Sequence, residues 1–316
     1  MYNGKPQLAD DLDMNNVRLP AWVQPKIDGV RAWNPKGTLL GRSMKTFEGF
    51  GVTDFWSKPE LVGLDGEMIL GDDPRAPRLC SITTGALGRF KGVTEMSRFS
   101  WWVFDLVTPE TYLMPYEQRY EMLEAKVRQL SQDRDDIYLV ERSEIHDMDQ
   151  LNWHISKHLD EGYEGTITRN HKAPVKEGRP GKKTQELMRM KPWLDAELLV
   201  TKISEGNSNN NEAKINELGH TERSTAKAGL TANGRLANVT GTLLKDVHDT
   251  GGKLLFPAGM EVTISKGEMT VEEQMDFWQN PEKIVGKIAK FVHFAYGVKN
   301  TVRMAQFKSL RLKEDM

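Results

Sequence analysis

Cysteine is almost absent from this sequence of 316 residues, which contains Cys80 alone. A single thiol cannot form a disulfide within the chain, and it cannot supply the group of cysteines that a zinc ribbon or an iron–sulfur cluster requires. The sequence therefore excludes small disulfide-bonded scaffolds and cysteine-based metal sites. It also indicates an intracellular protein, because disulfides are typical of secreted domains.

Long apolar runs and an excess of one charge are also missing. No window approaches the ~18 consecutive apolar residues that a membrane-spanning helix needs, and Met1–Pro20 has no apolar core of a secretion signal. The 43 basic and 45 acidic side chains give a net charge of -2, unlike a uniformly basic nucleic-acid coat protein. We therefore expect a soluble protein without a membrane partner, in which any polyanion is bound by local basic patches.

Short apolar runs separated by glycine and proline dominate the first part of the chain. They predict strands at residues 21–23, 30–33, 38–40 and 64–70, and an aromatic strand at 100–107. Apolar residues spaced by three and four predict amphipathic helices at 115–130 and 147–161. Helices thus interrupt a strand-rich pattern, which predicts an α+β fold.

The composition changes after residue 205. A polar, asparagine-rich stretch up to residue 238 predicts an exposed loop or a mobile hinge, and we place the domain boundary just before it, near Asp195. Beyond it the pattern predicts strands at 236–244, 260–265, 287–296 and 302–310 and a short helix at 271–279. This strand content predicts a small barrel, of which the OB-fold is the commonest version that binds nucleic acid.

One lysine stands out for its chemistry. Lys26 lies in the segment Gln24–Arg31 (QPKIDGVR), in a strand and turn setting. A lysine amine is a nucleophile when burial or a neighbouring cation disfavours its protonated form. Taken alone, Asp28-Gly29 is equally typical of the turn in an ordinary surface hairpin.

Five further motifs follow Lys26 in order. They are Gly41-Arg42-Ser43, Asp65-Gly66-Glu67, Phe104-Asp105, Glu164-Gly165 and Arg189-Met190-Lys191-Pro192. Each alone is compatible with a turn or a core strand. Together the six resemble the covalent nucleotidyltransferases, and within them the compact, bacteriophage-like ATP-dependent DNA ligases. The resemblance covers residues 23–192 well and the rest more loosely.

The resemblance implies a fold and a division into domains. Residues 1–195 are the expected adenylation (nucleotidyltransferase) domain, with ATP-grasp-like antiparallel sheets and flanking helices. Residues 196–316 are the expected small all-β OB-fold domain.

The resemblance also implies roles for individual residues. Lys26 is the expected catalytic residue, which carries AMP in a phosphoramidate bond. The expected nucleotide contacts are Gln24 beside the adenine edge, Phe104 stacked on adenine, and Arg31, Arg42, Glu67, Arg189 and Lys191. Glu67 and Glu164 are the expected ligands of a divalent metal, with Mg²⁺ favoured by their oxygen donors. We also expect Lys191 and nearby arginines to disfavour the ammonium form of Lys26.

Two features depart from the family pattern. Arg189 stands where the family usually has lysine, and arginine keeps the charge but not the compact ammonium geometry. Near the C-terminus, Arg303, Phe307 and Arg311 resemble the motif that orients the pyrophosphate leaving group, but the acidic–basic pair that closes this motif in the family is not clearly matched. The alternative for this segment is a terminal strand whose basic edge prevents edge-to-edge pairing.

Basic residues cluster twice despite the balanced total. Residues 165–191 contain eight basic and two acidic side chains, and a second cluster comprises Lys299, Arg303, Lys308, Arg311 and Lys313. Such clusters are either solvated loops or contacts with a phosphate backbone.

The sequence thus predicts a monomeric ATP-dependent DNA ligase that seals 5′-phosphate/3′-hydroxyl nicks in double-stranded DNA and serves replication, repair and recombination. ATP is favoured over NAD because one cysteine and 316 residues leave no room for the zinc site and extra modules of the NAD-dependent relatives. If the protein is phage-encoded, its location is the host cytoplasm.

Three alternatives remain open at this point. The first two are an RNA ligase and a GTP-using mRNA-capping guanylyltransferase, which share the Lys-x-Asp-Gly chemistry. The third is a non-catalytic nucleic-acid-binding protein built on a decayed transferase domain. That third alternative requires the loss of Lys26, Glu67 or Glu164, and all three are present.

Overall fold

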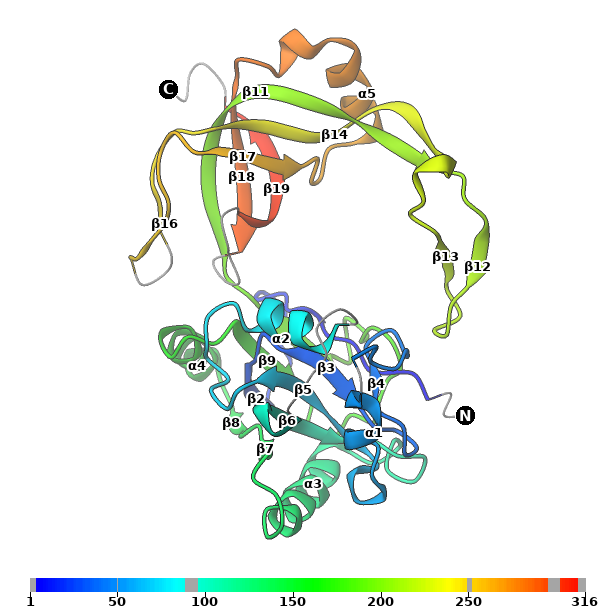
Figure 1. The fold of residues 1–316 in the computed structure, drawn as a ribbon. Helices are drawn as coiled ribbons and strands as arrows, with labels where there is room; N and C mark the ends of the chain where they lie inside the picture. Colours follow the sequence, from blue (N-terminus) through cyan, green and yellow to red (C-terminus); the bar gives the residue numbers. More distant parts are fainter. Residues whose placement is uncertain (1–3, 50, 89–95, 249–251, 295–301, 312–316) are drawn as a thin grey trace. The chain divides into compact units, whose positions relative to one another are not determined.

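The computed structural model describes residues 4–49, 51–88, 96–248, 252–294 and 302–311. The chain forms two compact units, Met1–Lys191 and Pro192–Met316 (Figure 1). The division falls directly after the Arg189-Met190-Lys191 motif. Each unit has its own sheets and its own hydrophobic core.

Unit 1 is built on two five-stranded sheets. The first has the order β1 (Asp10–Asp11), β10 (Leu187–Met190), β9 (Gly165–Arg169), β2 (Ala21–Lys26) and β8 (Ser143–Ile145). The second has the order β4 (Leu40–Gly41), β3 (Val30–Trp33), β5 (Leu64–Leu70), β6 (Phe99–Leu106) and β7 (Ile137–Leu139). Because β2 and β3 belong to different sheets, the segment after Lys26 is a crossing between sheets, and the surface-hairpin alternative is wrong.

Four helices of the described residues flank these sheets, and the spacing of apolar residues predicted the third and the fourth but neither of the first two. They are α1 (Val52–Trp56), α2 (Leu79–Leu87), α3 (Tyr116–Leu130) and α4 (Met148–Asp160), with 3-10 turns at Pro59–Leu61 and Met96–Arg98. The apolar stripe of α3 buries Tyr120 and Leu123 in the same cluster as Trp101 of β6. The side chain of Asp147 caps α4 by accepting a 2.8 Å hydrogen bond from the Gln150 backbone N–H. The predicted α+β content is confirmed.

Unit 2 contains a closed barrel with the strand order β11 (Trp193–Asn209), β14 (Leu230–Leu243), β17 (Glu261–Ser265), β19 (Arg303–Leu310) and β18 (Ile288–Phe294). Apolar residues alternate along the strands and fill the interior, for example Val262 and Ile264 on β17 and Phe291 on β18. The predicted helix, α5 (Val271–Gln279), begins with a capping box formed by Thr270 and Glu273. The remaining elements are β15 (Val247–His248), β16 (Leu254–Phe256) and 3-10 turns at Lys227–Gly229 and Pro281–Lys283.

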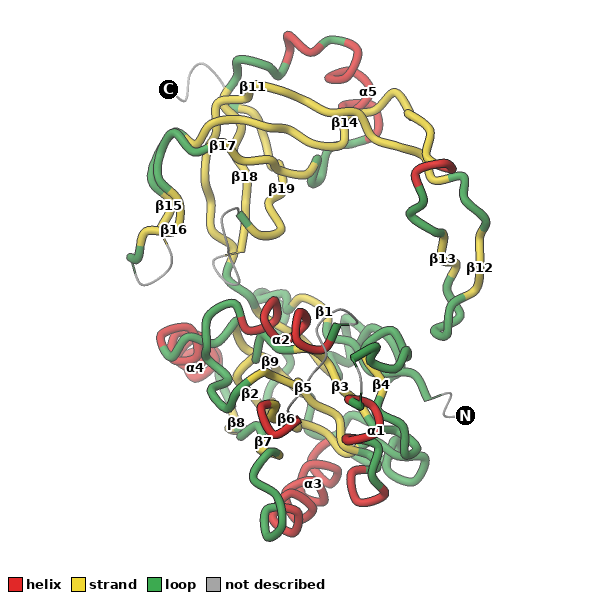
Figure 2. The backbone as a smooth tube through the Cα atoms, viewed as in Figure 1, coloured by secondary structure: helices red, strands yellow, loops and turns green. Residues whose placement is uncertain are grey.

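The prediction of a loop or hinge at residues 205–238 is wrong. Strands β11 and β14 extend into this stretch, and between them β12 (Ala213–Ile215) pairs with β13 (Thr221–Arg223) (Figure 2). Backbone hydrogen bonds hold strands together whatever side chains they carry. The Asn211 amide adds 2.9 Å hydrogen bonds to the carbonyl oxygens of Ser224 and Ala226. The polar composition of residues 205–238 therefore indicated that they are exposed, but it did not indicate their backbone conformation.

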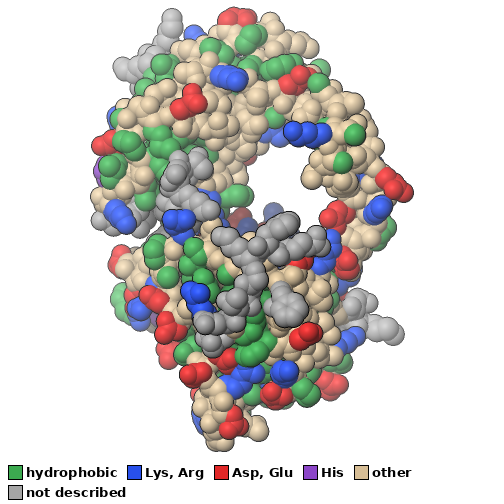
Figure 3. Space-filling model, in the orientation of Figure 1, with side chains coloured by type: hydrophobic (Ala, Val, Ile, Leu, Met, Phe, Trp, Pro, Cys, Tyr) green, Lys and Arg blue, Asp and Glu red, His purple; other side chains and the backbone are tan. Residues whose placement is uncertain are grey.

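The surface agrees with the balanced composition. On the face drawn in Figure 3, Lys and Arg side chains are interspersed with Asp and Glu. In the described part of the chain, every helix is too short or too polar to cross a membrane.

We predict that His158 makes the stability of unit 1 depend on pH. Burial lowers the pKa of His158 to about 4, with contributions from His154 and Lys157. The folded state keeps this imidazole neutral, whereas the unfolded chain takes up a proton below its ordinary pKa of ~6.5. The stabilisation is therefore present above about pH 6.5 and is lost as the pH falls toward 4, by about 3 kcal/mol in all.

Urea unfolding at several pH values tests this, with wild type compared against His158→Gln. Tryptophan fluorescence reports mainly on unit 1, because six of the eight tryptophans lie there. The free energy of unfolding of His158→Gln should fall less steeply between pH 6.5 and 4; identical slopes in the two proteins would contradict the assignment.

Candidate active site

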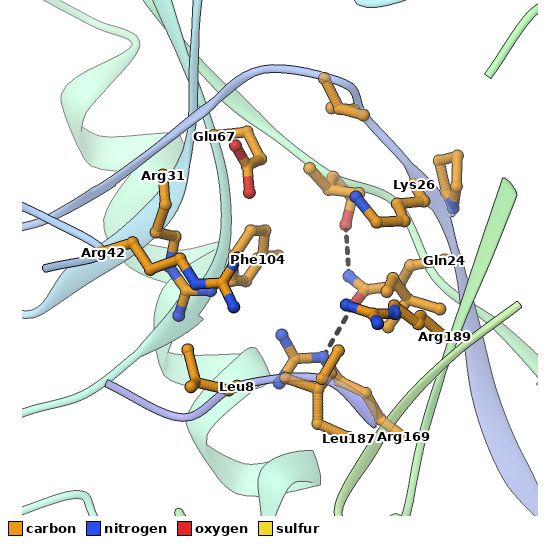
Figure 4. A pocket seen from close by; sticks show the side chains of 15 residues that line it. Leu8, Gln24, Lys26, Arg31, Arg42, Glu67, Phe104, Arg169, Leu187 and Arg189 are labelled. Atoms are coloured by element: carbon orange, nitrogen blue, oxygen red, sulfur yellow. Dashed lines mark hydrogen bonds between the residues drawn. The ribbon is translucent and has the colours of Figure 1, made fainter. Parts of the chain in front are cut away.

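Three adjacent strands of the first sheet bring predicted residues to one face. Side chains alternate along a strand, so residues paired directly across a ladder point to the same side. Ile167 of β9 pairs with Gln24 on one side and with Arg189 on the other, and Lys26 pairs with Gly165. Gln24, Lys26 and Arg189 line one pocket (Figure 4).

The second sheet supplies the other wall of this pocket. Arg31 on β3 pairs directly with Glu67 on β5, and both line the pocket. The ladder between β5 and β6 skips one residue, so Phe104 has no direct partner. Such a β-bulge re-aims a side chain, and the Phe104 ring also lines the pocket. The close ladder requires Gly66, because a Cβ there would lie 2.3 Å from the Trp102 carbonyl oxygen.

The lysine predicted to be the nucleophile is held by a buried carboxylate. Lys26 ends β2, and its ammonium group donates a hydrogen bond to Glu164. Lys191 donates to the other oxygen of the same carboxylate. The side chain of Glu164 is only 4% exposed, and its backbone N–H donates to the Lys26 carbonyl oxygen at 2.9 Å. One carboxylate thus brings together both lysines that sequence reasoning assigned to the reaction.

The charges around Lys26 correct one expectation. Burial lowers the pKa of Lys26, but the carboxylates of Glu164 and Glu67 outweigh it and raise the pKa above its ordinary value. It is Lys191 whose pKa is lowered, by burial and by the positive charge of Lys26. The expected effect of crowded cations therefore falls on Lys191, and Lys26 rests as an ammonium ion paired with Glu164.

Glu67 and Glu164 are the two carboxylates predicted to hold a metal. Burial raises the pKa of Glu67 to about 7; Lys26 and Arg31 oppose this rise, and the charge of Glu164 adds to it. The two carboxylates are close enough to repel each other, and a cation would relieve this repulsion. Among the described residues no three His, Cys, Asp or Glu side chains gather as a metal site. A pair of carboxylates completed by water and phosphate oxygens fits Mg²⁺.

The three arginines predicted to contact the nucleotide differ in their surroundings. Arg31 forms an ion pair with Asp65 through two contacts of 2.5 Å. Arg42 follows β4, is exposed and lines the pocket. Arg189 also lines the pocket, while its Nε donates to Asp11 of β1 at 2.7 Å.

Sequence reasoning missed a buried polar network beside Gln24. Asp105 accepts hydrogen bonds from Arg119 at 2.8 and 2.9 Å and from Arg169 at 3.0 Å. Arg169 also donates to Oε1 of Gln24 at 3.0 Å, and the Tyr116 hydroxyl donates to the same oxygen at 3.1 Å. The sequence could have indicated Arg169, because side chains alternate along β9 and this alternation puts Arg169 on the face of the strand that lines the pocket.

The first basic cluster is not one surface. Arg169 is 3% exposed, so its grouping with cations that contact a phosphate backbone is wrong. Arg179 pairs with Asp10 at 2.8 Å, as Arg189 does with Asp11. The exposed lysines of this cluster are Lys172, Lys176, Lys182 and Lys183.

The terminal strand of unit 2 carries the predicted closing motif. Arg303 begins β19. Arg311 directly follows the end of this strand and donates a hydrogen bond to Glu197 at 2.6 Å. Phe307 is 6% exposed and packs in the barrel core, so its ring is not presented at the surface. Lys299 and Lys313 lie outside the described residues.

Comparison with known proteins adds independent information. The model of a family described as "ATP dependent DNA ligase domain" matches residues 6–191. A DNA ligase of African swine fever virus is 28% identical over 197 residues, which is 58% of this chain and 44% of that relative. The DNA ligase of a Kenyan isolate of this virus is 29% identical over 197 residues, again 58% of this chain and 44% of that relative. The chain therefore spans less than half the length of these curated relatives.

Solved structures share the fold. Chlorella virus DNA ligase-adenylate has a TM-score of 0.51 at 22% identity, and a Lig E DNA ligase has a TM-score of 0.68 at 17% identity. Both comparisons cover 97% of this chain and 99% of the other. The architecture is thus the nucleotidyltransferase type of fold found in ligases.

We predict that Gly165→Ala disrupts the site through the backbone. A Cβ at this position would lie 2.1 Å from the Met190 carbonyl oxygen. The substitution should therefore separate β9 from β10 and lower the free energy of unfolding by more than about 2 kcal/mol. Gly85→Ala on α2 is the matched control, since no atom lies within 4 Å of a Cβ there. Urea unfolding of both variants tests this, and equal stability of the two would show that the close approach is unimportant.

Proposed function

This chain belongs to the ATP-dependent DNA ligase domain family, and we propose that it seals 5′-phosphate/3′-hydroxyl nicks in duplex DNA through a lysyl-AMP and a DNA-adenylate. The observation that carries the proposal is the pairing of Lys26 and Lys191 on the buried carboxylate of Glu164, in a unit whose pocket is also lined by Glu67 and Phe104. An amine nucleophile, cations and carboxylates are the groups that nucleotidyl transfer to nitrogen requires.

In the first step the neutral amine of Lys26 attacks the α-phosphorus of ATP. The new phosphorus–nitrogen bond forms as the bond to the bridging oxygen of pyrophosphate breaks, and pyrophosphate leaves with the electron pair. Because Lys26 rests as an ammonium ion, it first gives up a proton. That proton passes to water, because the low pKa of Glu164 keeps this carboxylate ionised. Lys191 keeps a cation beside the phosphate oxygens, where negative charge develops.

In the second step an oxygen of the DNA 5′-phosphate attacks the phosphorus of the lysyl-AMP. The phosphorus–nitrogen bond breaks, and the amine of Lys26 leaves and takes up a proton. In the third step the 3′-hydroxyl attacks the phosphorus of the 5′-phosphate and loses its proton. The phosphodiester forms as AMP is displaced. The same cations oppose the developing negative charge in every step.

We propose the nucleotide contacts that the family resemblance implies, for residues that line the pocket and for Lys191, which shares the Glu164 carboxylate. Gln24 and Phe104 hold the base, Arg31 and Glu67 lie toward the sugar, and Arg42 and Arg189 face the phosphates, together with Lys191. Glu67 and Glu164 would hold Mg²⁺, which supplies positive charge to the phosphate oxygens when bound.

We propose a separate role for each of the two units. Residues 1–191, predicted as 1–195, form the proposed adenylation domain, and residues 192–316, predicted as 196–316, contain a barrel that we propose to be an OB-fold. Arg303, which begins β19, and Arg311, which directly follows β19, are proposed to orient pyrophosphate during self-adenylation. The proposed substrate is nicked double-stranded DNA, bound by a monomer within the cell.

We predict that Lys26→Ala and Lys26→Arg abolish the covalent AMP adduct. Arginine retains a cation for Glu164 but has no free amine to attack phosphorus, so it separates loss of chemistry from loss of folding. Incubation with radiolabelled ATP followed by a denaturing gel measures the adduct. A normal yield of adduct in either variant would overturn the role of Lys26.

The same assay distinguishes the proposed activity from its alternatives. With wild type, label from ATP should bind the chain and be discharged by nicked duplex DNA. Label from GTP alone would indicate a capping enzyme, and discharge only by RNA ends would indicate an RNA ligase.

We predict that binding to nicked DNA weakens steeply with salt. Each phosphate neutralised by a lysine or arginine contributes about 0.9 to the slope of log K against log salt. The double variant Lys182→Gln/Lys183→Gln, which removes two exposed lysines of the first basic cluster, should reduce that slope by about 2. Fluorescence anisotropy measures it, with Arg128→Gln on α3 as an exposed control. An unchanged slope would remove these lysines from the DNA interface.

A further inference from the structure

Arg169 is not explained by the stability of the buried network. The carboxylate of Asp105 already has a partner in Arg119, which reaches both of its oxygens at 2.8 and 2.9 Å. Burial raises the pKa of Asp105, but the two arginines outweigh it and hold the pKa below its ordinary value. A second buried guanidinium on one carboxylate leaves an excess positive charge, which costs free energy unless its donors serve another purpose.

Two other contacts of Arg169, Gln24 and Phe104, line the pocket. Its Nε donates to Oε1 of Gln24 at 3.0 Å, a bond drawn as a dashed line in Figure 4. Its guanidinium carbon lies 5.1 Å from the centre of the Phe104 ring and 4.5 Å from that of Tyr116. Gln24 and Phe104 are the two side chains assigned above to the nucleobase.

The bond from Arg169 also determines which way the Gln24 amide points. Oε1 accepts from Arg169 and from the Tyr116 hydroxyl, while Nε2 donates to the Val140 carbonyl oxygen at 3.0 Å. A guanidinium can only donate and a carbonyl can only accept, so the reversed amide would set donor against donor and acceptor against acceptor. Nε2 carries a second N–H hydrogen besides the one donated to Val140, and Gln24 lines the pocket.

We propose that Arg169 is a positioning residue for the nucleobase of the nucleotide, acting through the orientation of the Gln24 amide and the placement of the Phe104 ring. This rests on the proposed function. An N–H donor at Gln24 favours a purine with an acceptor at N1, as in adenine, over one that carries N–H there, as in guanine. A site built around one donor discriminates against a ligand that leaves that donor without an acceptor.

Arg169→Lys tests the role, because lysine keeps a charge beside Asp105 but cannot make both directed bonds. The KM for ATP in self-adenylation should rise about tenfold, the equivalent of one charge-assisted hydrogen bond, while kcat at saturating ATP stays within about threefold. The preference for ATP over GTP in kcat/KM should fall. Arg119→Lys is the matched control, since Arg119 shares Asp105 but hydrogen-bonds neither Gln24 nor Phe104. Its KM should stay that of wild type, and an equal rise in both variants would overturn the proposal.

A double-mutant cycle with Gln24→Met separates action through Gln24 from a general effect. If Arg169 acts through the amide, most of its effect on KM disappears in the Gln24→Met background. Full additivity, or an unchanged KM in Arg169→Lys, would overturn the role. Thermal unfolding of each variant accompanies the kinetics.

A measurement on wild type does not depend on how the variants fold. Purine riboside triphosphate retains the acceptor at N1, whereas inosine triphosphate carries N–H there. Wild type should form the covalent adduct more efficiently with the former, and equal efficiency would contradict the donor role of Gln24. A wild-type chain that forms no adduct even with ATP would contradict the proposed function instead.

Discussion

The carboxylate of Glu164 is the contact on which the site depends. It joins Lys26 and Lys191, which lie 138 residues before it and 27 residues after it in the chain. Burying a carboxylate is unfavourable unless it is paired, and here two ammonium groups share it. They hold the pKa of Glu164 below its ordinary value, although burial acts in the opposite direction. The charge state of Lys26, the proposed nucleophile, is thus coupled to the packing of β2 against β9 and of β9 against β10.

Backbone approach makes this arrangement possible. Gly165, next to Glu164, allows the Met190 carbonyl oxygen to come within 2.1 Å of where a Cβ would stand. Gly66 does the same between β5 and β6, where the skipped residue, Phe104, enters the pocket. Both walls therefore rely on a glycine at a crowded ladder, and most of their functional side chains lie on strands or directly beside them. Such positions hold side chains more rigidly than loops do.

Local patterns predicted many elements because they depend on neighbours in the chain. The strands at 30–33 and 64–70 and the helix at 271–279 have the predicted bounds. Conformation in the polar stretch around Asn211 was predicted wrongly, because strand pairing there rests on backbone hydrogen bonds that composition does not reveal. Arg169 was assigned to the surface for a related reason. Its charge is visible in the sequence, but its burial against Asp105 follows from the alignment of β9 and β6 in different sheets.

The identities and order of the six motifs are properties of the sequence, and they were sufficient to indicate the ligase family and the groups available for chemistry. The tertiary structure decided how those groups are paired and charged. Lys26 is an ammonium ion beside Glu164, Lys191 is the lysine with the lowered pKa, and Gln24 has one orientation. These outcomes depend on burial and on distances between residues far apart in the chain. No local pattern contains that information, because Coulombic interaction and desolvation are set by neighbours in space.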